Sequence, residues 1–164
     1  MSQYVVEFGA EQLRLVADAI KLILPEPRQI CIDSSHDKMS YTSTAKTFDE
    51  VVNDLATGIV ASAVIRTTDA AIRYALITSP QIHIPPLALW MGTIEIAVEN
   101  WTSTWDALLK QPGLRFVCVG LEEGLELRDE QISPETFPWE ADGLLAGAVR
   151  ANGETDWTQR VAAP

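Results

Sequence analysis

The sequence predicts an α+β fold: one domain with a mainly antiparallel sheet of about five to seven strands and helices packed on one face. Three observations lead to this class. The chain has 164 residues, 47% of them hydrophobic, which is enough for one core. Apolar residues recur at helical spacing in some segments and alternate at strand spacing in others. Hairpin signals between neighbouring strand-like segments favour antiparallel pairing. Residues 1–164 are therefore expected to form a single domain, with 152–164 as a loosely ordered tail.

The first element is a predicted helix from about Ala10 to Leu24. Its apolar residues recur three and four positions apart and form one stripe: Leu13, Val16, Ala17, Ile20, Ile23 and Leu24. Pro25 and Pro27 follow, and proline ends a helix because it lacks the N–H donor. The short apolar run Gln29–Ile32 then predicts a strand.

A second helix and a hairpin follow. Thr47 and Glu50 have the spacing of a capping box, so they predict a helix over Phe48–Thr57. Two β-rich runs come next, Ile59–Arg66 and Ala70–Thr78. The short polar connection between them predicts a β-hairpin.

The middle of the chain contains the clearest strand pattern. Thr93–Glu99 alternates strictly, which predicts a half-buried strand with one wet face. Before it, prolines flank a short piece, Gln81–Ile84, that is typical of an edge strand. After it come a predicted helix, about Thr102–Gln111, and an apolar strand, Leu114–Leu121.

The C-terminal part has weaker signals. Gly124 allows a turn into Leu125–Arg128, which predicts a second hairpin. Ser133-Pro134-Glu135 is a helix-start signal with proline in the first turn. Gly143–Arg150 fits a helix or a buried strand. In the tail, Trp157 is the only large apolar anchor.

The charge of the chain limits its partners. There are 23 acidic and 12 basic residues, a net charge of −11. Nucleic-acid binding depends on clustered Lys and Arg, and none cluster here, so no nucleic-acid partner is expected. An anionic membrane surface is disfavoured for the same reason, and no apolar run is long enough for a membrane span.

The cysteines and the N-terminus favour a cytoplasmic protein. Cys31 and Cys118 both lie in apolar runs, where two buried reduced thiols are favoured over a disulfide. The N-terminal segment lacks the basic and apolar regions of a signal peptide.

No motif predicts a metal or a cofactor. The only histidines, His36 and His83, and the two cysteines lack the spacing of a zinc site. The acid-rich segment does not fit the EF-hand pattern, and no glycine-rich phosphate loop is present. We therefore expect no metal site and no cofactor.

Carboxylates outside the acid-rich segment give the candidates for catalysis. Asp33 and Asp37 lie in an Asp-Ser-Ser-His-Asp run after a predicted strand, where turn chemistry explains the residues more simply than a nucleophilic site. Glu95 and Glu99 share a face of the predicted strand, with Cα atoms about 13 Å apart. Glycosidic acid–base pairs need roughly 5 to 9.5 Å between carboxyl groups. No catalytic residue is predicted, although these four carboxylates remain candidates for a pocket beside the sheet.

The most unusual feature is the acid-rich segment Leu121–Asp142, which we call the acidic segment. It contains eight acids and one base, Arg128. Such a local field steers a basic partner. Trp139 lies inside the segment, where an aromatic anchor ringed by acids is typical of a binding hot spot. The predicted partner-binding residues are Glu122, Glu123, Glu126, Asp129, Glu130, Trp139 and Glu140.

Two function classes follow from these patterns. The first is a non-enzymatic acidic protein that occludes or recruits a basic protein, possessing the size and charge of bacterial immunity proteins and antitoxins. The second is a small-ligand-binding protein or hydrolase that uses carboxylates in a pocket beside the sheet. A weaker third class is a structural subunit of a larger assembly, which would expose a large apolar patch. An acidic surface also increases solubility, but solubility alone does not require the charge to cluster.

Overall fold

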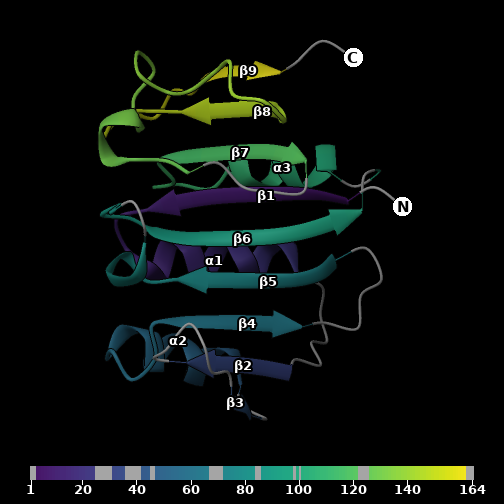
Figure 1. Ribbon diagram of the computed structural model, residues 1–164, viewed down its shortest axis with the longest axis vertical. Coiled ribbons are helices and arrows are strands. Elements are labelled where there is room, and N and C mark those ends of the chain that lie inside the picture. The colour runs from purple at the N-terminus through teal and green to yellow at the C-terminus, as the bar shows by residue number, and fades with distance from the viewer. Residues whose placement is uncertain are drawn as a thin grey trace.

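The computed structural model describes residues 3–24, 31–35, 42–44, 47–66, 72–83, 86–97, 99, 101–121 and 126–161. Its strands form one antiparallel sheet of nine strands in the order β3-β2-β4-β5-β6-β1-β7-β8-β9 (Figure 1). The strands are β1 Gln3–Ala10, β2 Cys31–Ser35, β3 Thr42–Thr44, β4 Ser62–Arg66, β5 Ile72–Thr78, β6 Trp90–Ala97, β7 Phe116–Leu121, β8 Leu144–Val149 and β9 Thr158–Val161. The helices are α1 Leu13–Ile23, α2 Phe48–Ala56 and α3 Trp101–Leu109, with short 3₁₀ turns η1 Pro80–Ile82 and η3 Asp129–Gln131.

The predicted α+β class is confirmed. Figure 1 shows all three helices behind the sheet, so the helices cover one face as expected. The outermost strands, β3 and β9, have three and four residues, and they enclose seven others. Five of the seven inner strands, β2, β4, β5, β6 and β7, overlap segments that the sequence predicted as strands.

The central strand β1 was not predicted. It lies between β6 and β7 and pairs antiparallel with both. Glycine at Gly9 and Gly92 is required by close packing in this region. A Cβ at Gly9 would lie 2.5 Å from the ring of Phe116, and one at Gly92 would lie 2.4 Å from the ring of Phe8.

The first core lies between the sheet and the helices. Strand residues that point to this face are fully buried, including Val6, Phe8, Ile94 and Ile96. The predicted stripe of α1 packs against them, with Val16 and Ile20 fully buried. The side chains of Ile94 and Ile96 therefore confirm the alternation that predicted this strand.

A second, smaller core lies on the opposite face of the sheet. It contains buried residues from the ends of β6, β7 and β8 together with two loops: Leu87, Leu89, Met91, Phe116, Cys118, Leu127, Ile132, Phe137 and Val149. Three of these, Leu127, Ile132 and Phe137, belong to the acidic segment. The acidic segment is therefore anchored to the face of the sheet that the helices leave open.

Helix starts and ends agree with the sequence only where local signals are strong. The capping box of α2 is present: the backbone N–H of Glu50 donates to Oγ1 of Thr47 at 3.2 Å, and the backbone N–H of Thr47 donates to Oε1 of Glu50 at 3.3 Å. Gly143–Arg150, which fitted a helix or a strand, forms strand β8.

Four local predictions were wrong. The described part of the predicted edge strand Gln81–Ile84, residues 81–83, is not a strand, because η1 begins at Pro80 and the hydroxyl of Ser79 caps it. Residues 126–128 are not paired as a hairpin, since β8 occupies the side of β7 where a returning strand would lie. Ser133-Pro134-Glu135 begins a turn rather than a helix. The tail is not loosely held over Thr158–Val161, which pairs with β8 as β9.

Two further expectations concern the cysteines and the membrane. Cys118 is a buried free thiol, as predicted, whereas the side chain of Cys31 lies outside the described residues. Among the described residues, no helix has the length and apolar character needed to cross a bilayer.

Candidate functional site

The candidate site is formed by residues 126–142 of the acidic segment, which lie on the open face of the sheet. Its backbone is fixed by the buried side chains of Leu127, Ile132 and Phe137. Full burial of one such side chain contributes roughly 1.5 to 3 kcal/mol. Turn hydrogen bonds add to this, including that from the N–H of Phe137 to the carbonyl of Ser133 at 2.9 Å. The carboxylates are therefore presented on an ordered scaffold.

All six acidic residues of this scaffold are exposed to solvent. The exposed acids are Glu126, Asp129, Glu130, Glu135, Glu140 and Asp142. Four of them, Glu126, Glu130, Glu135 and Asp142, make no ion pair with any residue in the described ranges. Their charge is therefore available to a partner.

Two predicted binding residues already have intramolecular partners. Oδ1 of Asp129 accepts a hydrogen bond from the backbone N–H of Ala88 at 2.7 Å, which ties the acidic segment to the loop before β6. Glu140 pairs with Nη1 of Arg160 on β9 at 3.0 Å. Because the Glu140 side chain is 93% exposed, this bridge contributes only about 0 to 1 kcal/mol.

Trp139 is packed on the molecule's own surface. Its Nε1 donates to the carbonyl of Pro134 at 3.0 Å, and its ring lies 4.7 Å from that of Phe137. Gly147 on β8 makes room for both rings, since a Cβ there would lie 2.9 Å from Phe137 and 3.2 Å from Trp139. The guanidinium of Arg160 lies 5.3 Å from the Trp139 ring. The ring is half-buried, so part of it still faces solvent beside the exposed acids.

The remaining two predicted binding residues, Glu122 and Glu123, lie outside the described residues. They precede Glu126 in the sequence by four and three positions. Their contribution to the acidic face stays a prediction.

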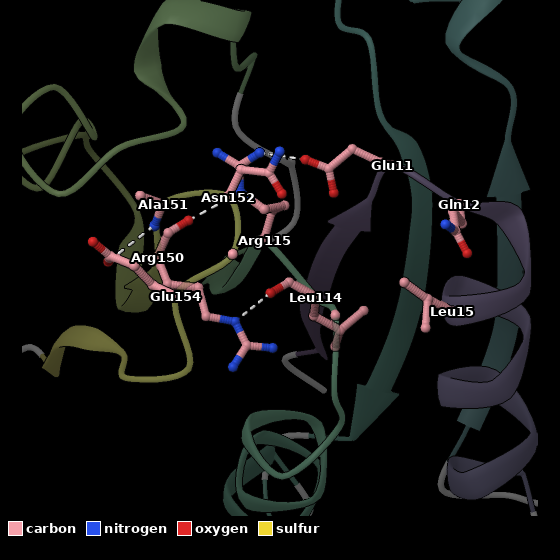
Figure 2. Close-up of a pocket in the computed structure, with 11 residues that line it drawn as sticks. Glu11, Gln12, Leu15, Leu114, Arg115, Arg150, Ala151, Asn152 and Glu154 are labelled. Atoms are coloured by element: carbon pink, nitrogen blue, oxygen red, sulfur yellow. Dashed lines mark hydrogen bonds and ion pairs between the residues drawn. The ribbon is translucent and has the colours of Figure 1, made fainter.

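A polar cleft of about 470 Å³ lies at the start of α1, beside the ends of β7 and β8. Figure 2 shows the guanidinium groups of its two arginines pointing away from each other, that of Arg115 beside Glu11 and that of Arg150 beside Leu114. Carboxylates of Glu11 and Glu154 also line the cleft. This cleft is therefore the candidate for a ligand-binding or catalytic site.

Arg150 is buried, and its guanidinium group stabilises the fold through hydrogen bonds to three loop carbonyls. Its Nε donates to the carbonyl of Leu114 at 2.6 Å, Nη1 to that of Thr155 at 3.0 Å, and Nη2 to that of Gln111 at 3.1 Å. The guanidinium lies 4.0 Å from the ring of Trp157. Burial lowers the pKa of Arg150 because desolvation disfavours the charged form. Each guanidinium nitrogen thus holds a loop carbonyl.

Arg115 has a similar structural role. Its Nε donates to the carbonyl of Arg150 at 3.0 Å and Nη2 to that of Ile132 at 3.1 Å, while Nη1 pairs with Glu11. Glu154 is also engaged, since its Oε2 accepts from the N–H of Ala151 at 3.4 Å. Neither carboxylate of the cleft is unpaired.

Of the four carboxylates proposed for a pocket beside the sheet, the structure describes the side chains of two, and these do not share a strand face. Glu95 is half-buried on β6, whereas Glu99 lies beyond the end of that strand at Ala97. The prediction that they share one strand face was therefore wrong. The side chains of Asp33 and Asp37 lie outside the described residues. Within the described ranges, no three His, Cys, Asp or Glu residues are grouped to hold a metal ion.

Sequence reasoning missed both arginines. Arg150 follows the ambiguous run that forms β8, and Arg115 precedes β7, so both stand at strand ends. An isolated basic residue next to an apolar strand is a weak signal for a buried clamp. Their role depends largely on carbonyls distant in sequence, such as that of Leu114, 36 positions from Arg150, and no local pattern reveals these partners.

Comparisons with known proteins found no relative. No family model matches the chain, and neither the curated proteins nor the solved structures compared with it gave a match.

Proposed function

We propose that this chain is a non-enzymatic acidic binding protein that occludes or recruits a basic protein partner, in the manner of immunity proteins and antitoxins. The observation that carries the proposal is the exposure of six carboxylates on a backbone fixed by a second core. A pre-organised surface loses little conformational entropy when it binds. Charge of one sign on such a surface also raises the rate of association with an oppositely charged partner.

The arginine cleft gives less support to a ligand-binding or hydrolytic function. A carboxylate that acts as a general acid or base must be free to exchange a proton with the substrate, and its pKa must suit that role. Glu11 is paired with Arg115 and Glu154 with a backbone N–H, so both act in the fold. We therefore favour the binding function and propose that it operates in the cytoplasm, where a buried free thiol such as Cys118 stays reduced.

Charge reversal on the acidic segment tests the proposal. The test variant carries Glu126→Lys, Glu130→Lys and Glu140→Lys, all at exposed positions. The matched control carries three reversals at exposed sites outside the segment: Asp18→Lys, Glu99→Lys and Asp106→Lys. Both variants change the net charge equally, so only the position of the charge differs.

The expected result is selective loss of a basic partner. A basic protein from the source cells should bind the unmodified chain and the control variant at low salt, and should be lost from the test variant. High salt should weaken binding, since the Debye length falls from about 10 Å at 0.1 M to about 3 Å at 1 M. Equal retention by the test and control variants would rule the proposal out.

A further inference from the structure

Strand β9 forms one edge of the sheet. It is the last strand in the sheet order and pairs only with β8 among the described residues (Figure 1). All four of its residues are exposed. An edge strand presents unpaired backbone N–H and C=O groups, which can template an added strand.

The register identifies which backbone groups face outward. The N–H of Arg150 donates to the carbonyl of Arg115, so position 150 directs its hydrogen bonds toward β7. This direction alternates along an antiparallel strand, so Gly147 and Val149 direct theirs toward β9. Their register partners on β9 are Arg160 and Thr158. The N–H and C=O groups of the other two residues, Gln159 and Val161, therefore point away from the sheet.

The two faces beside this edge differ in chemistry. Arg160 lies on the face of the acidic segment, where it contacts Trp139 and pairs with the exposed Glu140. Side chains alternate along a strand, so Val161 lies on the opposite, helix-covered face, and it is 53% exposed. A strand added to β9 would thus meet the carboxylate of Glu140 on one face and the apolar side chain of Val161 on the other.

We infer that the basic partner binds by adding an extended segment to β9, with alternating Lys or Arg and apolar residues. This inference rests on the proposed function and specifies how the same partner is recognised. The basic side chains would lie over the acidic segment and the apolar ones beside Val161. A second copy of this chain is a poorer occupant, because each copy carries a net charge of −11.

The test uses an alternating Lys-Val heptapeptide and two N-methylated forms of it, one methylated on the lysines and one on the valines. All three have the same charge. Backbone N–H groups alternate in direction along a strand, as side chains do. In an added strand, therefore, either the lysine N–H groups or the valine N–H groups face β9, but not both. One methylated form should therefore lose about tenfold in affinity or more, and the other should bind like the parent peptide.

Protein variants test the same edge from the other side. Gln159→Pro removes an outward N–H without removing a hydrogen bond to β8. It should lower the affinity for the parent peptide about tenfold. Gln159→Ala keeps the N–H and should bind normally. Arg160→Ala should tighten binding, because it frees Glu140 and removes a like charge. Amide exchange should slow at Gln159 and Val161 when the peptide binds.

The outcomes separate this inference from the function on which it rests. If all three peptides bind equally and the Glu126, Glu130 and Glu140 reversals abolish binding of each, charge recognition stands and strand addition is wrong. If the parent peptide does not bind, or the reversals leave its binding unchanged, this inference is wrong, whereas the proposed function fails only if the test and control variants retain a basic protein equally. Protection of Gln159 and Val161 in a peptide-free dimer would overturn the choice of a basic partner.

Discussion

Arg115 and Arg150 hydrogen-bond to each other's backbone across the β7–β8 junction. The N–H of Arg150 donates to the carbonyl of Arg115 at 3.1 Å, and Nε of Arg115 donates to the carbonyl of Arg150 at 3.0 Å. From this junction, Arg115 reaches the carbonyl of Ile132 in the acidic segment, and Arg150 reaches that of Thr155 before β9. The two arginines therefore join the acidic segment and the C-terminal strand to the sheet.

Replacement of Arg150 should destabilise the fold strongly. Arg150→Ala would leave three loop carbonyls without their donor, and we expect a loss of about 3 to 5 kcal/mol in the free energy of unfolding. Arg150→Lys should recover little of this, because an ammonium group does not reproduce the planar fork. Urea titration followed by tryptophan fluorescence measures the effect. The control is Arg160→Ala, whose exposed pair should cost about 1 kcal/mol or less. Equal losses for Arg150→Ala and the control would contradict the clamp.

A side chain at Gly147 should disturb the anchor of the acidic segment. In Gly147→Ala the new methyl group would lie 2.9 Å from Cε1 of Phe137, so we expect a loss of about 1 to 3 kcal/mol. Phe137→Leu is smaller at the point of contact and should reduce the cost of the Gly147 substitution. A double-mutant cycle in urea measures this coupling. Additive effects of the two substitutions would show that the ring of Phe137 does not rest on Gly147.

The Cys118 thiol should make stability fall at alkaline pH. Burial raises its pKa well above the ordinary value of 9.0, and the charge of Glu7 raises it further. The unfolded chain therefore loses this proton first as the pH rises, and stability is full only below the unfolded pKa. Between about pH 8 and about pH 10, ionisation of the thiol in the unfolded chain should lower the free energy of unfolding by about 1 kcal/mol.

Comparison with Cys118→Ala isolates the contribution of this thiol. Over the same pH interval, the free energy of unfolding of the variant should fall by about 1 kcal/mol less than that of the unmodified chain. Unfolding in urea at both pH values provides the measurement. Parallel pH profiles for the two proteins would mean that the thiol ionises as easily in the folded chain as in the unfolded one.

The sequence predicted the elements whose signals are local. The capping box of α2, the stripe of α1 and the alternation of β6 each lie within a few residues, so they could be found without the fold. Strand β1 could not, since Glu7 and Gly9 interrupt its apolar pattern. The reason for each residue lies in contacts with strands distant in sequence. Gly9 lies against Phe116 of β7, and Glu7 is 9% exposed between β6 and β7.

The acidic segment illustrates the same limit for the candidate site. Its charge was evident from the sequence, and its exposed carboxylates are where that charge predicted them. The path of its backbone could not be predicted from the sequence, because Leu127, Ile132 and Phe137 pack on strands distant in sequence. The helix-start signal Ser133-Pro134-Glu135 predicted a helix, yet burial of Phe137 against the sheet favours an irregular backbone path.

The most direct test of the central claim is parallel affinity capture from source-cell lysate at low salt with three baits. These are the unmodified chain, the variant reversed at Glu126, Glu130 and Glu140, and the control reversed at Asp18, Glu99 and Asp106. The account predicts that a basic protein is retained by the first and third baits and is absent from the second. Capture of the same proteins by all three baits, or of no basic protein by the unmodified chain, would contradict it.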